Sequence, residues 1–316
     1  MAEDTSKKPP AQAQDSMDQL ISNLAAKDFK TKNDAIKQLG KLRHQKARDK
    51  LFEIAESVEW NGRLRITAID MLGRGNVDKR FINLMNKIAN DAAQDKEIRR
   101  TAITQLSRLR DMGSLDTLIK ALDDEYRFIR FWAVRGLIKY KDRRVYPALI
   151  KALGDDDEEI RKEAQSHLEL IGSEALPSLI KAMKNPDGSK FMRYGVIGLL
   201  GRIDNPETVP PLIEALKDGN PRVITLAAMA LGKSKNPSAI KPLLKAYKDN
   251  EDRRRIISDA LFHLLEDLRR DAAIQLVGLL NQEPLLQDLA KNLFEKIGTQ
   301  ARSEEHTSEL QSPNTI

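Results

Sequence analysis

Apolar residues recur every four positions along the chain, in blocks that are separated by polar turns. In one block Ile129, Ala133 and Leu137 are spaced by four, and Arg130 follows the first of them. Residues at i, i+4 and i+8 share one face of an α-helix. The spacing therefore predicts an amphipathic helix whose apolar stripe faces a core.

The same block recurs along the chain, and successive copies begin 30–34 residues apart. The nine starts are positions 31, 64, 98, 129, 160, 192, 223, 256 and 286. Each block leads through a short turn into a second apolar helix, which reads Leu-Ile-Lys-Ala-Leu at 118–122 and 149–153. One such pair cannot bury both of its apolar faces, so neighbouring pairs must stack. The sequence predicts an all-α fold, an α-α superhelix of about nine stacked helix pairs with the last one partial.

Glycine often stands near the end of the first helix of a copy. A left-handed residue commonly ends a helix, and glycine adopts that conformation at little cost. We therefore expect left-handed C-caps at these glycines, which are Gly40, Gly73, Gly172, Gly201 and Gly232.

Composition sets the boundaries of the predicted solenoid. Residues 1–16 are rich in Pro, Gln, Ser and charge, which predicts a disordered lead-in, and the repeats occupy 17–301. Residues 302–312, RSEEHTSELQS, match the translation of a common sequencing adapter. We expect 302–316 to be disordered and foreign to the natural chain, which would continue past about Ala301. Leaving this segment out removes one positive and three negative charges, so the formal net charge rises from +6 to +8.

The absence of cysteine excludes disulfides and cysteine-ligated metals and fits a reducing compartment. Neither an apolar run of about 18 residues nor the apolar core of a secretory signal occurs. We therefore expect a cytoplasmic protein without membrane partners.

The repeat, with its arginine slot and its Leu-Ile-Lys-Ala-Leu helix, resembles HEAT repeats. It is most similar to the short form of about thirty residues that also occurs in phycobilisome lyase-type HEAT-like proteins. The resemblance covers about 17–299. It implies that the second helices line a concave surface, and it says more about the fold than about the function.

Lysine occupies one equivalent slot in several second helices. Glu214 interrupts this lysine series, whose members are Lys120, Lys151, Lys181 and Lys245. A basic stripe of this kind suits an acidic peptide, a phosphate or a nucleic-acid backbone. The alternative is that lysine fills the solvated side of an amphipathic helix.

Arginine occupies the second slot of several first helices. The members of this arginine series are Arg65, Arg99, Arg130, Arg161 and Arg193, and Ile224 and Ile257 follow in the same slot. Because aspartates lie in the turns between copies, we expect these arginines to form intramolecular pairs between adjacent repeats.

An aromatic cluster distinguishes the fourth copy from the others. Helical projection places Phe128, Phe131 and Arg135 away from the core stripe, where they can form an aromatic and cationic patch for a partner. Packing between neighbouring repeats is the alternative.

No arrangement typical of an active site occurs in the sequence. The histidines are far apart in a linear stack, the carboxylate pairs lie in solvated turns, and neither a G-x-S-x-G nor a phosphate-binding G-x-x-x-x-G-K-[ST] motif occurs. We expect no enzymatic activity, no cofactor and no metal.

Three functions are consistent with this pattern. The first is a non-enzymatic protein-binding scaffold or assembly factor that uses the curved surface of the solenoid. The second is a nucleic-acid binder with the architecture of HEAT-like DNA glycosylases, which rests on the net charge and the lysine series. The third is a phycobilin lyase-type subunit, which rests on the short repeat form. The partner and the oligomeric state stay open.

Overall fold

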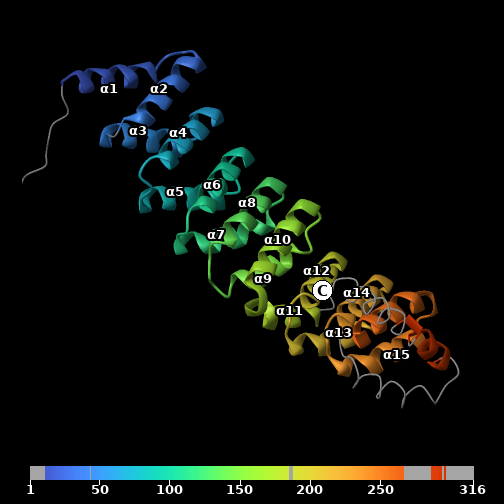
Figure 1. The fold of residues 1–316 in the computed structure, drawn as a ribbon. Coiled ribbons are helices and arrows are strands. Elements are labelled where there is room, and N and C mark those ends of the chain that lie inside the picture. The colour runs from blue at the N-terminus through green and yellow to red at the C-terminus, as the bar shows by residue number, and fades with distance from the viewer. Residues whose placement is uncertain (1–10, 43, 185–187, 267–285, 294, 297–316) are drawn as a thin grey trace, which may run out of the picture. The chain divides into compact units, whose positions relative to one another are not determined.

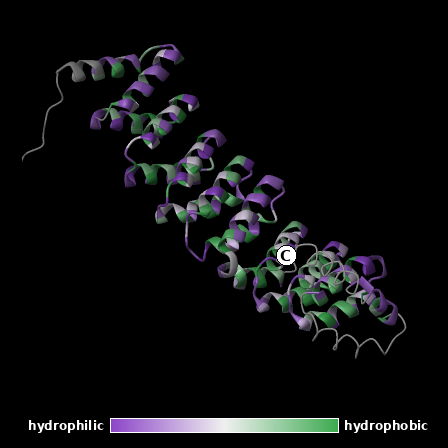
Figure 2. Cartoon of the chain, in the orientation of Figure 1, coloured by the Kyte–Doolittle hydropathy of each residue, from purple (hydrophilic) through white to green (hydrophobic). Residues whose placement is uncertain are grey.

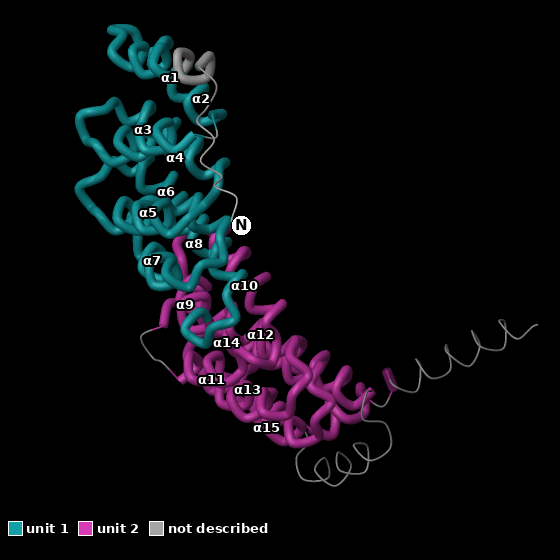
Figure 3. The backbone as a smooth tube through the Cα atoms, turned by 90° about the vertical axis from the view of Figure 1, so that its left-hand side faces the viewer, with its two compact units in different colours: residues 1–145 teal, residues 146–316 magenta. Residues whose placement is uncertain are grey.

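The computed structural model describes residues 11–42, 44–184, 188–266, 286–293, 295 and 296. Within these residues every regular element is an α-helix or a short 3-10 helix, and no strand occurs. The chain divides into two compact units, residues 1–145 and 146–316, which we call unit 1 and unit 2 (Figure 3).

Unit 1 contains helices that lie in two rows (Figure 1). An A row consists of α2 (Phe29–Lys41), α4 (Gly62–Arg74), α6 (Lys96–Arg108) and α8 (Arg127–Leu137), each packed against the next. A B row consists of α3 (Gln45–Glu56), α5 (Lys79–Asn90) and α7 (Leu115–Lys120). The first helix, α1 (Ala11–Asn23), packs against α2, and the 3-10 turns η1 (Met112–Ser114) and η2 (Ala121–Asp123) flank α7.

Unit 2 repeats this arrangement. Its A row consists of α10 (Glu158–Ile171), α12 (Lys190–Leu200), α14 (Pro221–Gly232) and a helix over 254–266. Its B row consists of α9 (Val145–Ala152), which begins at the unit boundary, α11 (Leu176–Met183), α13 (Val209–Ala215) and α15 (Ile240–Asp249). The 3-10 turns are η3 (Gly172–Ala175), η4 (Pro206–Thr208), η5 (Pro237–Ala239) and η6 (Glu251–Arg253).

The predicted apolar stripes form the core of both units. Ile129, Ala133 and Leu137 are at most 1% exposed, and the equivalent residues of the next copy, Ile160, Ala164 and Leu168, are fully buried. Green and purple segments alternate along the helices in Figure 2, as expected for helices with one apolar face. The predicted all-α solenoid of stacked helix pairs is therefore confirmed.

The turns between repeats start the A-row helices by side-chain capping. Asp157 accepts hydrogen bonds from the backbone N–H groups of Glu159 and Ile160 before α10, and Asn220 accepts one from Arg222 before α14. These bonds satisfy donors that have no partner within the helix. Asp157 and Asn220 therefore fix where α10 and α14 begin, and Ser189 does the same for α12.

The predicted ends of the chain are only partly described. Helix α1 begins at Ala11, inside the stretch 1–16 that we expected to be a disordered lead-in. Its first residues, Ala-Gln-Ala-Gln, are good helix formers, which accounts for the earlier start. Residues 302–316, which we expect to be foreign, and the segment 267–285 lie outside the described residues.

Most of the glycines expected as left-handed C-caps have a different role. Gly172 has φ = 64° and caps α10 as expected, but it is the only described glycine with a positive φ. Gly201 and Gly232 instead lie where consecutive A-row helices come closest. A Cβ on Gly232 would lie 2.8 Å from the carbonyl oxygen of Ala260, and one on Gly201 would lie 2.7 Å from the Cβ of Ala230.

The same close approach occurs in unit 1. A Cβ on Gly40 would collide with Met71, and one on Gly73 would collide with Gln105 on the following A-row helix. The prediction of left-handed caps was therefore wrong for Gly40, Gly73, Gly201 and Gly232. The missing side chain lets the A-row helices approach each other, and the backbone at these positions does not need the left-handed region.

Replacing Gly232 with alanine tests this role of the glycines. We expect Gly232→Ala to lower the free energy of unfolding by about 1–3 kcal/mol, because the new methyl group must displace the backbone of Ala260. The control is Gly198→Ala in the last turn of α12, where nothing lies within 4 Å of the new Cβ. This change should stabilise the chain by about 0.5–1 kcal/mol through helix propensity. Urea unfolding followed by circular dichroism measures both, and equal effects of the two changes would contradict the account.

Candidate functional site

Two arginines of the arginine series pair with an aspartate 25 residues later. Arg193 on α12 contacts Asp218 at 2.8 Å, and Arg99 on α6 pairs with Asp124. Both aspartates lie in the turn that leads into the next A-row helix. The expected pairing between adjacent repeats is confirmed for these residues.

Two further members of the series bind the backbone of the turn before their own helix. The guanidinium of Arg130 donates to the carbonyl oxygens of Asp124 and Glu125, and that of Arg161 donates to those of Asp155 and Asp156, at 2.7–3.1 Å. These oxygens follow the end of a B-row helix and have no intrahelical donor. The arginine series therefore binds the turn before an A-row helix in some copies and the turn after it in others.

The series ends in unit 2, where Ile224 occupies the arginine slot of α14. The aspartate 25 residues later is Asp249, at the end of α15. Asp249 is exposed and makes no hydrogen bond or ion pair with any described residue. Asp218, which has its arginine, is only 20% exposed at its side chain. The substitution of isoleucine therefore leaves an aspartate without the partner that its equivalents have.

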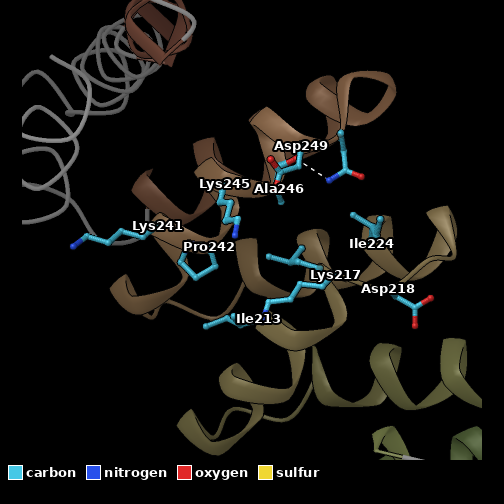
Figure 4. Close-up of a pocket in the computed structure, with 11 residues that line it drawn as sticks. Ile213, Lys217, Asp218, Ile224, Lys241, Pro242, Lys245, Ala246 and Asp249 are labelled. Carbon is cyan, nitrogen blue, oxygen red and sulfur yellow. Dashed lines mark hydrogen bonds between the residues drawn. The ribbon is translucent and has the colours of Figure 1, made fainter. Parts of the chain in front are cut away.

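A groove lies where the arginine series is interrupted, and it is lined by residues of α13 and α15 and by Ile224 of α14 (Figure 4). Its volume is about 560 Å³, within the roughly 300–1,000 Å³ of typical binding pockets. The apolar residues that line it are Ile213, Leu216, Ile224, Pro242 and Ala246. We call this hollow the α13–α15 groove.

Positive and negative side chains lie towards opposite ends of the α13–α15 groove. Lys241 lies at one end, and Asp218 and Asp249 lie towards the other, with Lys245 extending from α15 towards α13 (Figure 4). Lys217 pairs with Glu214 at 2.9 Å, and Asp218 pairs with Arg193.

The remaining charges in the groove have no counter-ion. The side chains of Lys241, Lys245 and Asp249 make no ion pair or hydrogen bond with any described residue. The groove therefore combines an apolar floor with two cations and one anion that are free to bind a ligand.

The four predicted lysines are all exposed, but they are not all in one unit. Lys120 ends α7 in unit 1, and the other three lie on the B row of unit 2, Lys151 on α9, Lys181 on α11 and Lys245 on α15. Among these four, Lys245 lines the α13–α15 groove. Lys241 was not predicted as a contact residue from the sequence, although it lies one helical turn before Lys245 on α15.

The predicted aromatic patch lies on α8 in unit 1. Phe128 is 42% exposed, Phe131 is half-buried and Arg135 is exposed. Arg135 stacks on both Phe131 and Trp132, at 5.7 and 5.4 Å from the ring centroids. Phe128 instead contacts the ring of Tyr126 edge-on at 5.3 Å. The structure therefore joins Phe131 and Arg135 with Trp132, and places Phe128 in a separate pair.

Aromatic residues also join neighbouring repeats in unit 2. Arg161 on α10 stacks on Phe191 of α12 at 4.3 Å, and Arg222 on α14 stacks on Tyr194 of α12 at 5.0 Å. Contacts of this kind are worth about 0.5–1 kcal/mol at exposed sites. In these pairs the aromatic residues pack between neighbouring repeats, which is the alternative to partner binding that the sequence also allowed for aromatic residues.

The three histidines in the described part of the chain lie in separate local settings. Nδ1 of His44 accepts a hydrogen bond from the backbone of Lys46 at the start of α3, His167 lies beside Glu163 on α10, and His263 lies beside Glu266. Across the described ranges no three His, Asp or Glu side chains are grouped as a metal site requires.

Hydrogen bonds lower the pKa of several carboxyl groups and so favour their ionised form. The hydroxyl of Tyr126 donates to Glu97 at 2.6 Å and holds the pKa of that carboxyl below its usual value, with Arg100 adding to the effect. Hydrogen bonds from Thr31 similarly lower the pKa of Asp28. A general acid needs the opposite shift, so these carboxyl groups have a structural role.

No helix in the described part of the chain is long and apolar enough to cross a membrane.

The fold and the groove define an α-helical repeat protein whose helix pairs stack in two rows. The family model of HEAT repeats matches residues 83–169, 117–191 and 176–262, which together span more than half of the chain. The chain therefore belongs to the HEAT-repeat family. The match is to HEAT repeats in general, and the closer resemblance to the lyase-type form stays a prediction. A search of curated proteins finds no significant match.

Solved structures of importin beta and of Kap95p share this fold. Importin beta in an ammonium sulfate condition is 15% identical, with 89% of this chain and 46% of that chain covered and a TM-score of 0.52. Kap95p, from a structure that describes its binding to RanGDP, is 14% identical, with 89% and 45% covered and a TM-score of 0.54. This chain therefore spans about half the length of these relatives, and the low identity shows the fold alone.

Removing Arg193 tests whether the arginine series stabilises the fold. We expect Arg193→Gln to lower the free energy of unfolding by about 1–2 kcal/mol, because it leaves the half-buried Asp218 without its counter-ion. Arg202→Gln is the matched control, since Arg202 is 60% exposed in its pair with Glu169 and should contribute less than about 0.5 kcal/mol. Denaturant unfolding compares the two, and an Arg193 effect no larger than the control would count against a structural role.

Proposed function

We propose that the protein is a non-enzymatic protein-binding scaffold that holds its partner along the B row of unit 2, with the α13–α15 groove as the main contact. The observation that carries this proposal is an apolar hollow of about 560 Å³ with lysines that have no counter-ion among the described residues. Apolar cores with charged rims are typical of protein interfaces.

The lining of the groove favours a protein over a nucleic acid. Proteins that hold single strands stack the bases on aromatic side chains, and none of the residues that line this groove is aromatic. Asp218 and Asp249 would also repel phosphate groups. Aliphatic residues such as Ile213 and Leu216 instead suit apolar side chains of a partner.

Other predicted contact residues extend the proposal beyond the groove. Lys151 and Lys181 lie on the same B row, and their charge would attract acidic residues of a bound chain. In unit 1, Lys120 and the patch of Phe128, Phe131 and Arg135 are proposed as further contacts. The structural relatives support a binding role, since Kap95p is described in a complex with RanGDP. The lack of cysteine supports a cytoplasmic location.

The test starts by capturing partners with the full chain and purifying one that binds directly. We expect Lys245→Glu to weaken that complex about tenfold, because a carboxylate would replace a free cation at the edge of the groove. Lys233→Glu, an equally exposed lysine at the end of α14 and outside the groove, should leave the affinity unchanged. Titration calorimetry gives both dissociation constants.

A different result would overturn the proposal. If the chain captures no direct protein partner, and instead binds oligonucleotides with an affinity that falls steeply with salt, the nucleic-acid alternative replaces it.

A further inference from the structure

The α13–α15 groove lies where the pairing of arginine with aspartate is interrupted. In the two pairs described above, the guanidinium comes from the second slot of an A-row helix and the carboxylate lies 25 residues later. Ile224 and Asp249 have the same separation, and both line the groove. We therefore expect an arginine at 224 to extend into the groove towards Asp249.

The groove is therefore complementary to the missing side chain. An arginine has an aliphatic stem, which suits Ile224, Pro242 and Ala246, and a guanidinium, which binds a carboxylate in a planar, charge-assisted manner. Asp249 has no other partner among the described residues, so a bound arginine would not displace an existing ion pair.

The other end of the groove has the opposite charge. Lys241 and Lys245 lie one helical turn apart on α15, and Lys245 is one turn before Asp249. A segment that carries only basic residues would be repelled there. A segment in which acidic residues stand close to the arginine would find counter-ions at both ends.

We infer that the groove binds a protein segment whose arginine pairs with Asp249, in the place left by Ile224, while neighbouring acidic residues contact Lys245 and Lys241. This inference rests on the protein-binding function proposed above and specifies the chemistry of the bound segment. A lysine in place of the arginine is expected to bind more weakly, since it lacks the planar fork of donors.

The experiment uses the full chain with ¹³C-labelled isoleucine methyl groups and a blocked peptide, acetyl-Glu-Glu-Leu-Arg-Leu-Glu-Glu-amide. Its sequence is symmetric, so acidic residues reach the lysines in either direction of binding. The control peptide carries citrulline, which has nearly the shape of arginine but no charge. We expect the arginine peptide to shift the methyl signals of Ile224 and Ile213, and the citrulline peptide to bind at least about tenfold more weakly.

Variants of the protein assign the contact to Asp249. Asp249→Asn should lose binding of the arginine peptide by about tenfold, and it should fold normally because the side chain is exposed. Asp252→Asn makes the same chemical change three residues later, outside the groove, and should bind like the wild type. Equal affinity for the two peptides, undiminished binding by Asp249→Asn, or no binding of either peptide overturns the inference.

The two proposals fail in different ways. If a captured partner protein binds Asp249→Asn as tightly as the wild type, the arginine contact is wrong and the protein-binding function stands. If the arginine peptide binds in the groove while the full chain captures no partner, the chemistry of the groove stands and the scaffold function does not.

Discussion

In each unit, the arrangement of the stacked helix pairs depends on contacts between one pair and the turn that begins the next pair. Stacked helix pairs share apolar faces, and their burial supplies the main attraction between neighbouring pairs. The pairs Arg99–Asp124 and Arg193–Asp218 add direction, because a guanidinium and a carboxylate bind well only in a defined geometry. Glycines such as Gly232 complete the arrangement by allowing the A-row helices to come close.

The groove lies where the pairing of an A-row arginine with an aspartate 25 residues later is interrupted. Ile224 stands in the slot that holds an arginine in other copies, and it is shorter and uncharged. We explain the groove by this one difference within the repeat, which leaves room beside Ile224 and a charge on Asp249. Within this chain, such an interruption distinguishes one copy from its neighbours.

The sequence was sufficient to predict the fold because the apolar spacing repeats with little variation. The buried stripe of Ile129, Ala133 and Leu137 follows directly from helical periodicity. The role of Gly232 could not be predicted, because it depends on the distance to Ala260 on another helix. The end of the arginine series at Ile224 was visible in the sequence. Its consequence was not, since the partner of each arginine lies 25 residues away and becomes apparent only in three dimensions.

The central claim is that Ile224 stands in a slot where an arginine would bind Asp249. A double-mutant cycle tests it most directly, with unfolding free energies of the wild type, Ile224→Arg, Asp249→Asn and the double variant. The account predicts a favourable coupling of about 1 kcal/mol between the new arginine and Asp249. A coupling near zero would show that residues 224 and 249 do not meet, and the explanation of the groove would be wrong.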